Sequence, residues 1–126
     1  MKKIFPLFIV FAFMGLSKNE ASAQTGNLLL RHIVIITFEQ DASADSIKVL
    51  DDLYKNLSKN PMVKDFEMGV NVSTRDTGVV KHIYITSFAS KEDMDNYRKV
   101  PAYSQLFKVS LPVSAEVNVV DYWVEK

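Results

Sequence analysis

The sequence predicts an α+β fold of the ferredoxin-like type, with a four-stranded antiparallel sheet. Two long runs rich in β-branched residues, 29–38 and 80–88, predict its central strands. Each run contains a histidine near its start, lacks glycine and proline, and leaves neither face clearly polar, which is typical of strands buried on both faces. Each half of the chain also follows the order strand, helix, strand. Together these observations give the order β-α-β-β-α-β, the split βαβ arrangement.

The two outer strands alternate in polarity. In residues 63–72, Phe66, Met68 and Val70 share one side while Asp65 and Glu67 share the other. In residues 115–124, Val117, Val119, Asp121 and Trp123 share one face of the predicted last strand. We expect Trp123 at a dimer seam or at the end of a barrel. Both segments therefore predict strands, the first with a wetter face.

The helical segments show a period near 3.6 residues. Ser43 or Asp45 is suited to cap a helix over residues 46–58, and Ser90 a second one. In the first helix the spacing predicts an apolar face and an opposite, solvated face. The apolar residues are Ile47, Leu50, Leu53, Tyr54 and Leu57, and the solvated ones are Lys48, Asp51, Asp52, Lys55 and Lys59. Pro101 interrupts the second helical region, which resumes over residues 102–110.

Length and composition exclude several classes of protein. A chain of 126 residues with 48% hydrophobic content predicts one globular domain. The 15 basic and 15 acidic residues balance, so nothing points to nucleic acid as a partner. The absence of cysteine excludes disulfides, thiolate catalysis and cysteine-ligated metals. We expect no metal site and no cofactor.

The first 23 residues have the pattern of an export signal. Lys2 and Lys3 precede an almost wholly apolar run, residues 4–16, and Ala21-Ser22-Ala23 fits a cleavage site before Gln24. The run is shorter than the roughly 20 residues of a membrane-spanning helix. We therefore expect a signal peptide over 1–23, a short lead over 24–28 and the domain over 29–126. The mature protein is expected in the periplasm or outside the cell, free of the membrane.

The predicted sheet has too much apolar surface for its helices to cover. One face of the central strands carries Ile33, Ile35, Ile83 and Ile85, and the other carries Val34, Ile36 and Tyr84. Whichever face the helices cover, apolar side chains therefore remain on the other. A second sheet is the simplest cover for such a face. The sequence therefore predicts a homodimer that pairs two sheets face to face.

Several segments together resemble one known family. The matching stretches are Arg31-His32-Ile33-Val34, Gly69-Val70-Asn71, residues 82–88, Tyr97 followed by Pro101-Ala102, and Val119-Val120-Asp121-Tyr122. In order and spacing the chain resembles the stress-responsive dimeric α/β-barrel (Dabb) domain family over nearly all of residues 29–125. The resemblance implies a dimeric barrel, a link to stress, and a ligand pocket between sheet and helices.

The resemblance also raises polyketide cyclisation, which one plant branch of the family catalyses. That branch carries Tyr-x-x-His-Pro-x-His, in which the tyrosine and the last histidine perform acid–base chemistry. This chain matches the tyrosine with Tyr97 but has Val100 and Tyr103 at the histidine positions. Tyrosine is a poorer general base than histidine at neutral pH. The sequence therefore leaves enzymatic activity open and favours binding, with Tyr97 and His82 as the catalytic candidates.

The candidate ligand-binding residues are His32, His82, Tyr97, Tyr103 and Asn71. Histidines and tyrosines among apolar residues suit the polar lining of a pocket. The alternatives are hydrogen-bonded core histidines, ordinary core tyrosines, and an asparagine that caps a turn. Because the histidines begin antiparallel strands, we expect them near opposite ends of the ladder, which argues against a shared metal site.

We therefore expect an exported, homodimeric Dabb-like protein that holds a small apolar or aromatic molecule between sheet and helices. One alternative is a cofactor-independent enzyme, cyclase-like or monooxygenase-like, that uses Tyr97 and a histidine. The other is a structural dimer without a pocket.

Overall fold

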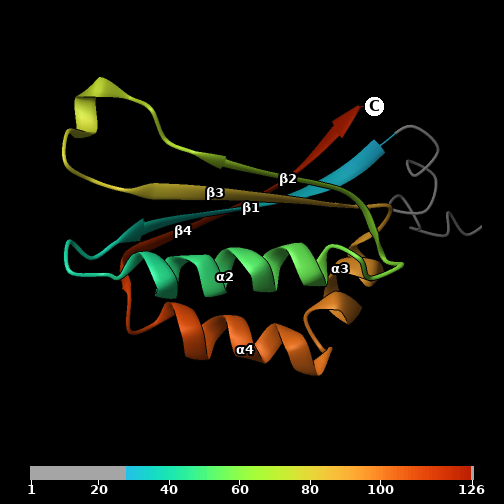
Figure 1. Cartoon of the computed structure of the whole chain (residues 1–126). Coiled ribbons are helices and arrows are strands. Elements are labelled where there is room, and N and C mark those ends of the chain that lie inside the picture. The colour runs from blue at the N-terminus through green and yellow to red at the C-terminus, as the bar shows by residue number, and fades with distance from the viewer. Residues whose placement is uncertain (1–27, 126) are drawn as a thin grey trace, which may run out of the picture.

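The computed structural model describes residues 28–125, and its elements follow the predicted order with the second helical region divided in two (Figure 1). The elements are β1 (Leu28–Phe38), α2 (Ala44–Leu57), β2 (Val63–Val70), the 3₁₀ turn η1 (Thr74–Asp76), β3 (Lys81–Phe88), α3 (Lys91–Tyr97), α4 (Pro101–Ser110) and β4 (Ser114–Glu125). The predicted signal peptide lies outside the described residues. Within them, no helix is both long and apolar enough to cross a lipid bilayer.

The four strands form one antiparallel sheet in the order β2-β3-β1-β4. The two β-branched runs are therefore its central strands, as predicted. Figure 1 shows α2 and α4 side by side beneath the sheet, with α3 at one end of the same layer. The architecture is the predicted ferredoxin-like one, a sheet with helices on one face.

Alternation along β1 divides the sheet into a helix face and an open face. Leu30, His32, Val34 and Ile36 are buried on the helix face, whereas the intervening side chains are only half-buried. The predicted alternation of β2 is also confirmed, with half-buried Phe66 and Met68 aligned with buried residues of β3. Trp123 aligns with Leu30 on the helix face and is 39% exposed. It thus shares the face of the helices.

Two serines start the helices that the sequence predicts. Ser43 accepts a hydrogen bond from the Ser46 N–H at 3.1 Å, and Ser90 accepts one from the Asp93 N–H at 3.0 Å. Each bond satisfies a donor that a helix N-terminus otherwise leaves unpaired. Pro101 occupies the first turn of α4, where its missing N–H costs nothing.

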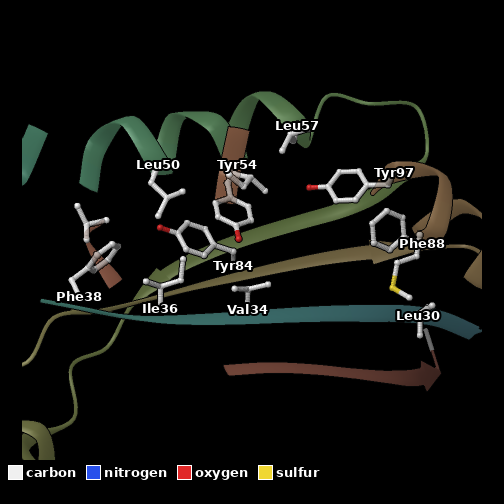
Figure 2. Packing of buried hydrophobic residues seen from close by; sticks show 13 residues of the cluster. Leu30, Val34, Ile36, Phe38, Leu50, Tyr54, Leu57, Tyr84, Phe88 and Tyr97 are labelled. Atoms are coloured by element: carbon white, nitrogen blue, oxygen red, sulfur yellow. The ribbon is translucent and has the colours of Figure 1, made fainter. Parts of the chain in front are cut away.

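Aromatic side chains make up much of the core between the sheet and the helices (Figure 2). Tyr54 of α2 stacks on Tyr84 of β3, with ring centroids 3.8 Å apart and planes 12° apart. Phe88 contacts Tyr97 at 5.0 Å between centroids. These contacts hold α2 and α3 against the central strand β3.

One residue of α2 contradicts the sequence prediction. Asp51, predicted on the solvated face, has a side chain only 14% exposed and turned toward the sheet. Its position four residues after Ile47 and three before Tyr54 puts it on the side of the helix that packs. The prediction was wrong because it followed the polarity of Asp51 instead of its spacing.

The open face is apolar at its centre. Ile33 and Ile35 of β1 align with Ile85 and Ile83 of β3, and all four are half-buried. Val120 of β4 aligns with Ile33 and is 51% exposed. No helix of the described chain covers this face (Figure 1). The predicted excess of apolar sheet surface is therefore present.

Candidate functional site

A cavity of about 200 Å³ lies between the helix face of β1 and β4 and the helices α2 and α4. Its lining residues are His32, Val34, Ile36, Tyr54, Tyr103, Leu106, Phe107, Ser110, Leu111, Val117 and Val119. Val119 is 52% exposed and Phe107 54% exposed. The cavity therefore opens between edge strand β4 and α4.

His32 is a polar group in the wall of this cavity, and a carboxylate orients it. Its Nδ1 lies 2.5 Å from Oδ1 of Asp121, its ladder partner on β4. Because a carboxylate accepts, Nδ1 carries the shared proton, and in the neutral ring Nε2 holds the lone pair. The His32 side chain is 5% exposed and Asp121 34% exposed, so the pair spans from the interior to the surface.

Arg98, which follows α3, completes this cluster. Its Nη2 lies 3.4 Å from Oδ2 of Asp121 and 3.4 Å from Nδ1 of His32. Since Nδ1 donates to Asp121 and a guanidinium has only donors, the attractive contact is with the carboxylate. Asp121 thus pairs with both neighbours, and its charge is balanced by Arg98.

Three tyrosines gather near the His32 end of the cavity. Tyr54 and Tyr103 belong to the lining, and Tyr97 contacts Tyr103 with ring centroids 5.4 Å apart. Burial raises the pKa of Tyr54 well above its ordinary value, and neighbouring Tyr103 and Tyr97 raise it further. Burial, with a contribution from Tyr103, raises the pKa of Tyr97 to about 12 against a hydrogen bond with Thr86. At neutral pH Tyr54 and Tyr97 are therefore hydrogen-bonding phenols and poor bases.

A second polar cluster lies beneath α2. Oδ1 of Asp51 accepts from Oη of Tyr84 at 2.7 Å and lies 2.8 Å from Nδ1 of His82. The side chains of His82 and Asp51 are 10% and 14% exposed. The ring of Tyr84 stacks on Tyr54, which lines the cavity. This cluster therefore supports one wall of the cavity from behind.

The structure brings only some of the predicted site residues together. His32 and Tyr103 line the cavity, whereas Tyr97 lies behind Tyr103, and His82 lies in the cluster beneath α2. Asn71 follows β2, where its Oδ1 accepts from the Ser73 N–H at 3.1 Å, the turn-capping alternative that the sequence left open. In the ladder His32 aligns with Thr86 while His82 aligns with Ile36, four positions along β1. The histidines thus sit apart, as expected.

Four residues of these clusters were not predicted from the sequence: Tyr54 as a lining residue, and Asp51, Arg98 and Asp121. Asp121 carried a usable signal, because it interrupts an otherwise apolar strand face formed by Val117, Val119 and Trp123. Arg98 carried none, since surface arginines follow helices routinely. Among residues 28–125, no group of three or more His, Cys, Asp or Glu side chains is arranged to hold a metal.

Solved structures share this architecture. The hydroxynitrile lyase from Passiflora edulis is 24% identical to this chain, with 78% of this chain and 94% of that one covered and a TM-score of 0.68. A dimeric ferredoxin-like protein of unknown function from Thermobifida fusca is 14% identical, with coverages of 79% and 93% and a TM-score of 0.67. A Dabb family protein with a ferredoxin-like fold from Mesorhizobium loti is 21% identical, with coverages of 75% and 95% and a TM-score of 0.62.

These similarities establish the fold. No curated protein matches the chain significantly in sequence. The profile of the Dabb family, described as the stress responsive A/B barrel domain, matches residues 30–124, which is most of the chain and includes every strand of the sheet. The chain therefore belongs to the Dabb family of stress-responsive α/β-barrel domains.

Proposed function

We propose that the protein binds a small, neutral, apolar or aromatic molecule in the cavity between the sheet and α4. The observation that carries the proposal is a mainly apolar cavity with an oriented histidine in its wall. A cavity of about 150 Å³ lined by apolar residues holds benzene, so about 200 Å³ suits one ring with substituents. Pockets of this kind use a few polar groups to orient a ligand within an apolar wall.

The lining also favours an uncharged ligand. None of the lining residues is a lysine, arginine, aspartate or glutamate. Arg98 and Asp121, beside His32, pair with each other. A buried charge without a partner is costly, so a carboxylate or ammonium group in this cavity would be poorly compensated. His32, Tyr54 and Tyr103 can instead exchange hydrogen bonds with a hydroxyl or carbonyl group.

An NMR titration with toluene, benzyl alcohol and benzoate tests this proposal. We expect saturable shifts at residues 32–36, 103–111 and 117–119 with the two neutral compounds, and binding of benzoate at least about tenfold weaker. Val119→Trp, at the mouth of the cavity, should abolish these shifts. Val49→Trp on α2, where Val49 is 50% exposed and outside the lining, is the matched control. Absence of saturable binding, or binding unchanged by Val119→Trp, would contradict the proposal.

A second candidate function is cofactor-independent acid–base catalysis in the same cavity. The specific observation is the Asp121–His32 pair, because an aspartate on Nδ1 leaves Nε2 suited to accept a proton from a bound substrate. Tyr97, the catalytic candidate from sequence, is 1% exposed, lies outside the lining and has a pKa raised by burial. His32 is therefore the better candidate for the base.

The likeness to a hydroxynitrile lyase makes mandelonitrile a suitable first substrate. Nε2 of His32 would take the hydroxyl proton while the carbon–carbon bond breaks, which gives benzaldehyde and a cyanide anion. The proton on Nε2 would then pass to cyanide, which leaves as hydrogen cyanide and restores the neutral base. Release of benzaldehyde, followed by its absorbance, should fall about 10²- to 10⁴-fold in His32→Gln if this base operates. Asp121→Asn should lower the rate too. Turnover that survives His32→Gln would exclude His32 as the base.

The homodimer and export complete the proposal. The apolar open face and the Thermobifida fusca neighbour described as dimeric support association through the sheet.

The pattern of residues 1–23 supports export. Expression of the full chain in a bacterial host, followed by mass measurement of the protein outside the cytoplasm, tests the second point. A chain that begins near Gln24 is expected there, and a full-length chain retained in the cytoplasm would contradict export.

A further inference from the structure

The cavity also has a polar side chain far from His32. Ser110, the last residue of α4, is 9% exposed and belongs to the lining. The lining also includes the apolar residues Ile36, Leu111 and Val117. A buried hydroxyl group normally has a hydrogen-bond partner, so we expect one for Ser110.

The hydroxyl of Ser110 has only a weak partner in its own helix. Oγ lies 3.5 Å from the carbonyl oxygen of Phe107, at the limit of a hydrogen bond. That carbonyl already accepts from the Leu111 N–H at 3.0 Å. By contrast, Oγ of Ser104 on the exposed side of the same helix lies 2.8 Å from the Pro101 carbonyl. The Ser110 hydroxyl is thus free to turn toward a better partner in the cavity.

Ser110 and the His32 group lie at opposite ends of the cavity. Tyr103 contacts Tyr97, which packs on Phe88 opposite Leu30, so it marks the end near His32. The backbone carbonyl oxygen of Ser110 accepts a hydrogen bond from Oγ of Ser114, which aligns with Phe38 at the other end of β1. Seven residues of helix separate Tyr103 from Ser110, or about 10 Å at 1.5 Å per residue. That span suits one aromatic ring with a polar substituent at each end.

We infer that the ligand is an aromatic molecule with two neutral hydrogen-bonding groups in para relation, one held by His32 and Tyr103 and the other by Ser110. The inference rests on the proposed binding function and specifies its ligand class. Ser110 is then a specificity-determining residue, because an unsubstituted ring leaves its hydroxyl without a good partner.

Binding of benzyl alcohol, 1,4-benzenedimethanol and 1,2-benzenedimethanol tests the inference. All three are neutral, and only the second carries hydroxyls at both ends. We expect it to bind about 3- to 10-fold more tightly than the other two, the gain from one hydrogen bond. Ser110→Ala removes the hydroxyl at almost constant volume and should abolish this preference. Ser104→Ala, the matched control, should retain it.

The outcomes separate the two proposals. Equal binding of the three compounds, or a preference that survives Ser110→Ala, overturns the inference while the binding function stands. If none of the compounds binds, the proposed function fails and the inference fails with it. Shifts of the Ser110 amide resonance with 1,4-benzenedimethanol that are smaller with benzyl alcohol support the assignment of the second group to this end.

Discussion

At the scale of single residues, Asp51 is a polar side chain on which two buried neighbours depend. One carboxylate oxygen pairs with both His82 and Tyr84, beneath a helix and largely away from water. Its loss would leave two buried polar groups without their partner, the costliest outcome for a hydrogen-bonded cluster. Neighbouring Asp52 offers the contrast, because its bond to Lys48 lies on the solvated surface.

We expect Asp51→Ala to lower the free energy of unfolding by about 2–4 kcal/mol. Asp52→Ala, which removes an exposed ion pair, should change it by less than about 1 kcal/mol. Urea titrations of the two variants beside the parent protein provide the comparison. Equal effects of the two substitutions would show that the Asp51 cluster contributes no more than a surface pair.

The raised pKa of Tyr97 predicts that the folded protein loses stability at alkaline pH. Its pKa is raised to about 12 in the fold, against about 10 for an exposed tyrosine. Between these values the folded protein keeps a proton that the unfolded chain releases, so stability is present below pH 10 and falls as pH rises, by about 1.4 kcal/mol per pH unit for this group. Unfolding measured from pH 9 to 11.5 should show a shallower decline in Tyr97→Phe. Parallel curves would contradict this.

At the scale of elements, the caps and the periodic faces of the helices follow from local sequence. Ser90 stands before seven residues of α3, a helix too short to be stable alone, and its Oγ satisfies the Asp93 N–H. We expect Ser90→Ala to cost about 1 kcal/mol in chemical denaturation. Ser104→Ala, in the exposed part of α4, should cost less than about 0.5 kcal/mol. A cost for Ser90→Ala no larger than that would mean that packing of Met94 and Tyr97 alone fixes α3.

The same locality explains which parts of the molecule the sequence predicts. The central strands and the interruption at Pro101 depend on runs and spacings of residues that are neighbours in the sequence. The cavity depends on contacts between β1, β4 and α4, and no local pattern tells that Tyr103 lines it while Tyr97 packs behind. His32 was predicted as a polar residue of the site, but its partner Asp121 lies 89 residues away, where only strand pairing brings the two together.

At the scale of the whole molecule, the open face predicts self-association. Val119 and Val120 are consecutive in β4 and almost equally exposed, at 52% and 51%, yet they face the cavity and the open face respectively. We expect the mature protein to be a dimer by analytical ultracentrifugation at micromolar concentration. Val120→Lys should shift it toward monomer by at least about tenfold in dissociation constant, since a lysine would be desolvated there. Val119→Lys, on the opposite face of β4, should leave the dissociation constant of the dimer unchanged. A monomeric parent protein would refute the assignment of the open face as a dimer interface.

The position of β4 at the edge of the sheet has a thermodynamic consequence. Val117 and Val119 of this strand belong to the cavity wall, whereas Asn118 and Val120 belong to the open face. A bound ligand and a second subunit would thus contact opposite faces of the same strand. If ligand binding changes the position or the rigidity of β4 and so alters the dimerisation constant, then dimerisation must alter the ligand-binding constant by the same factor.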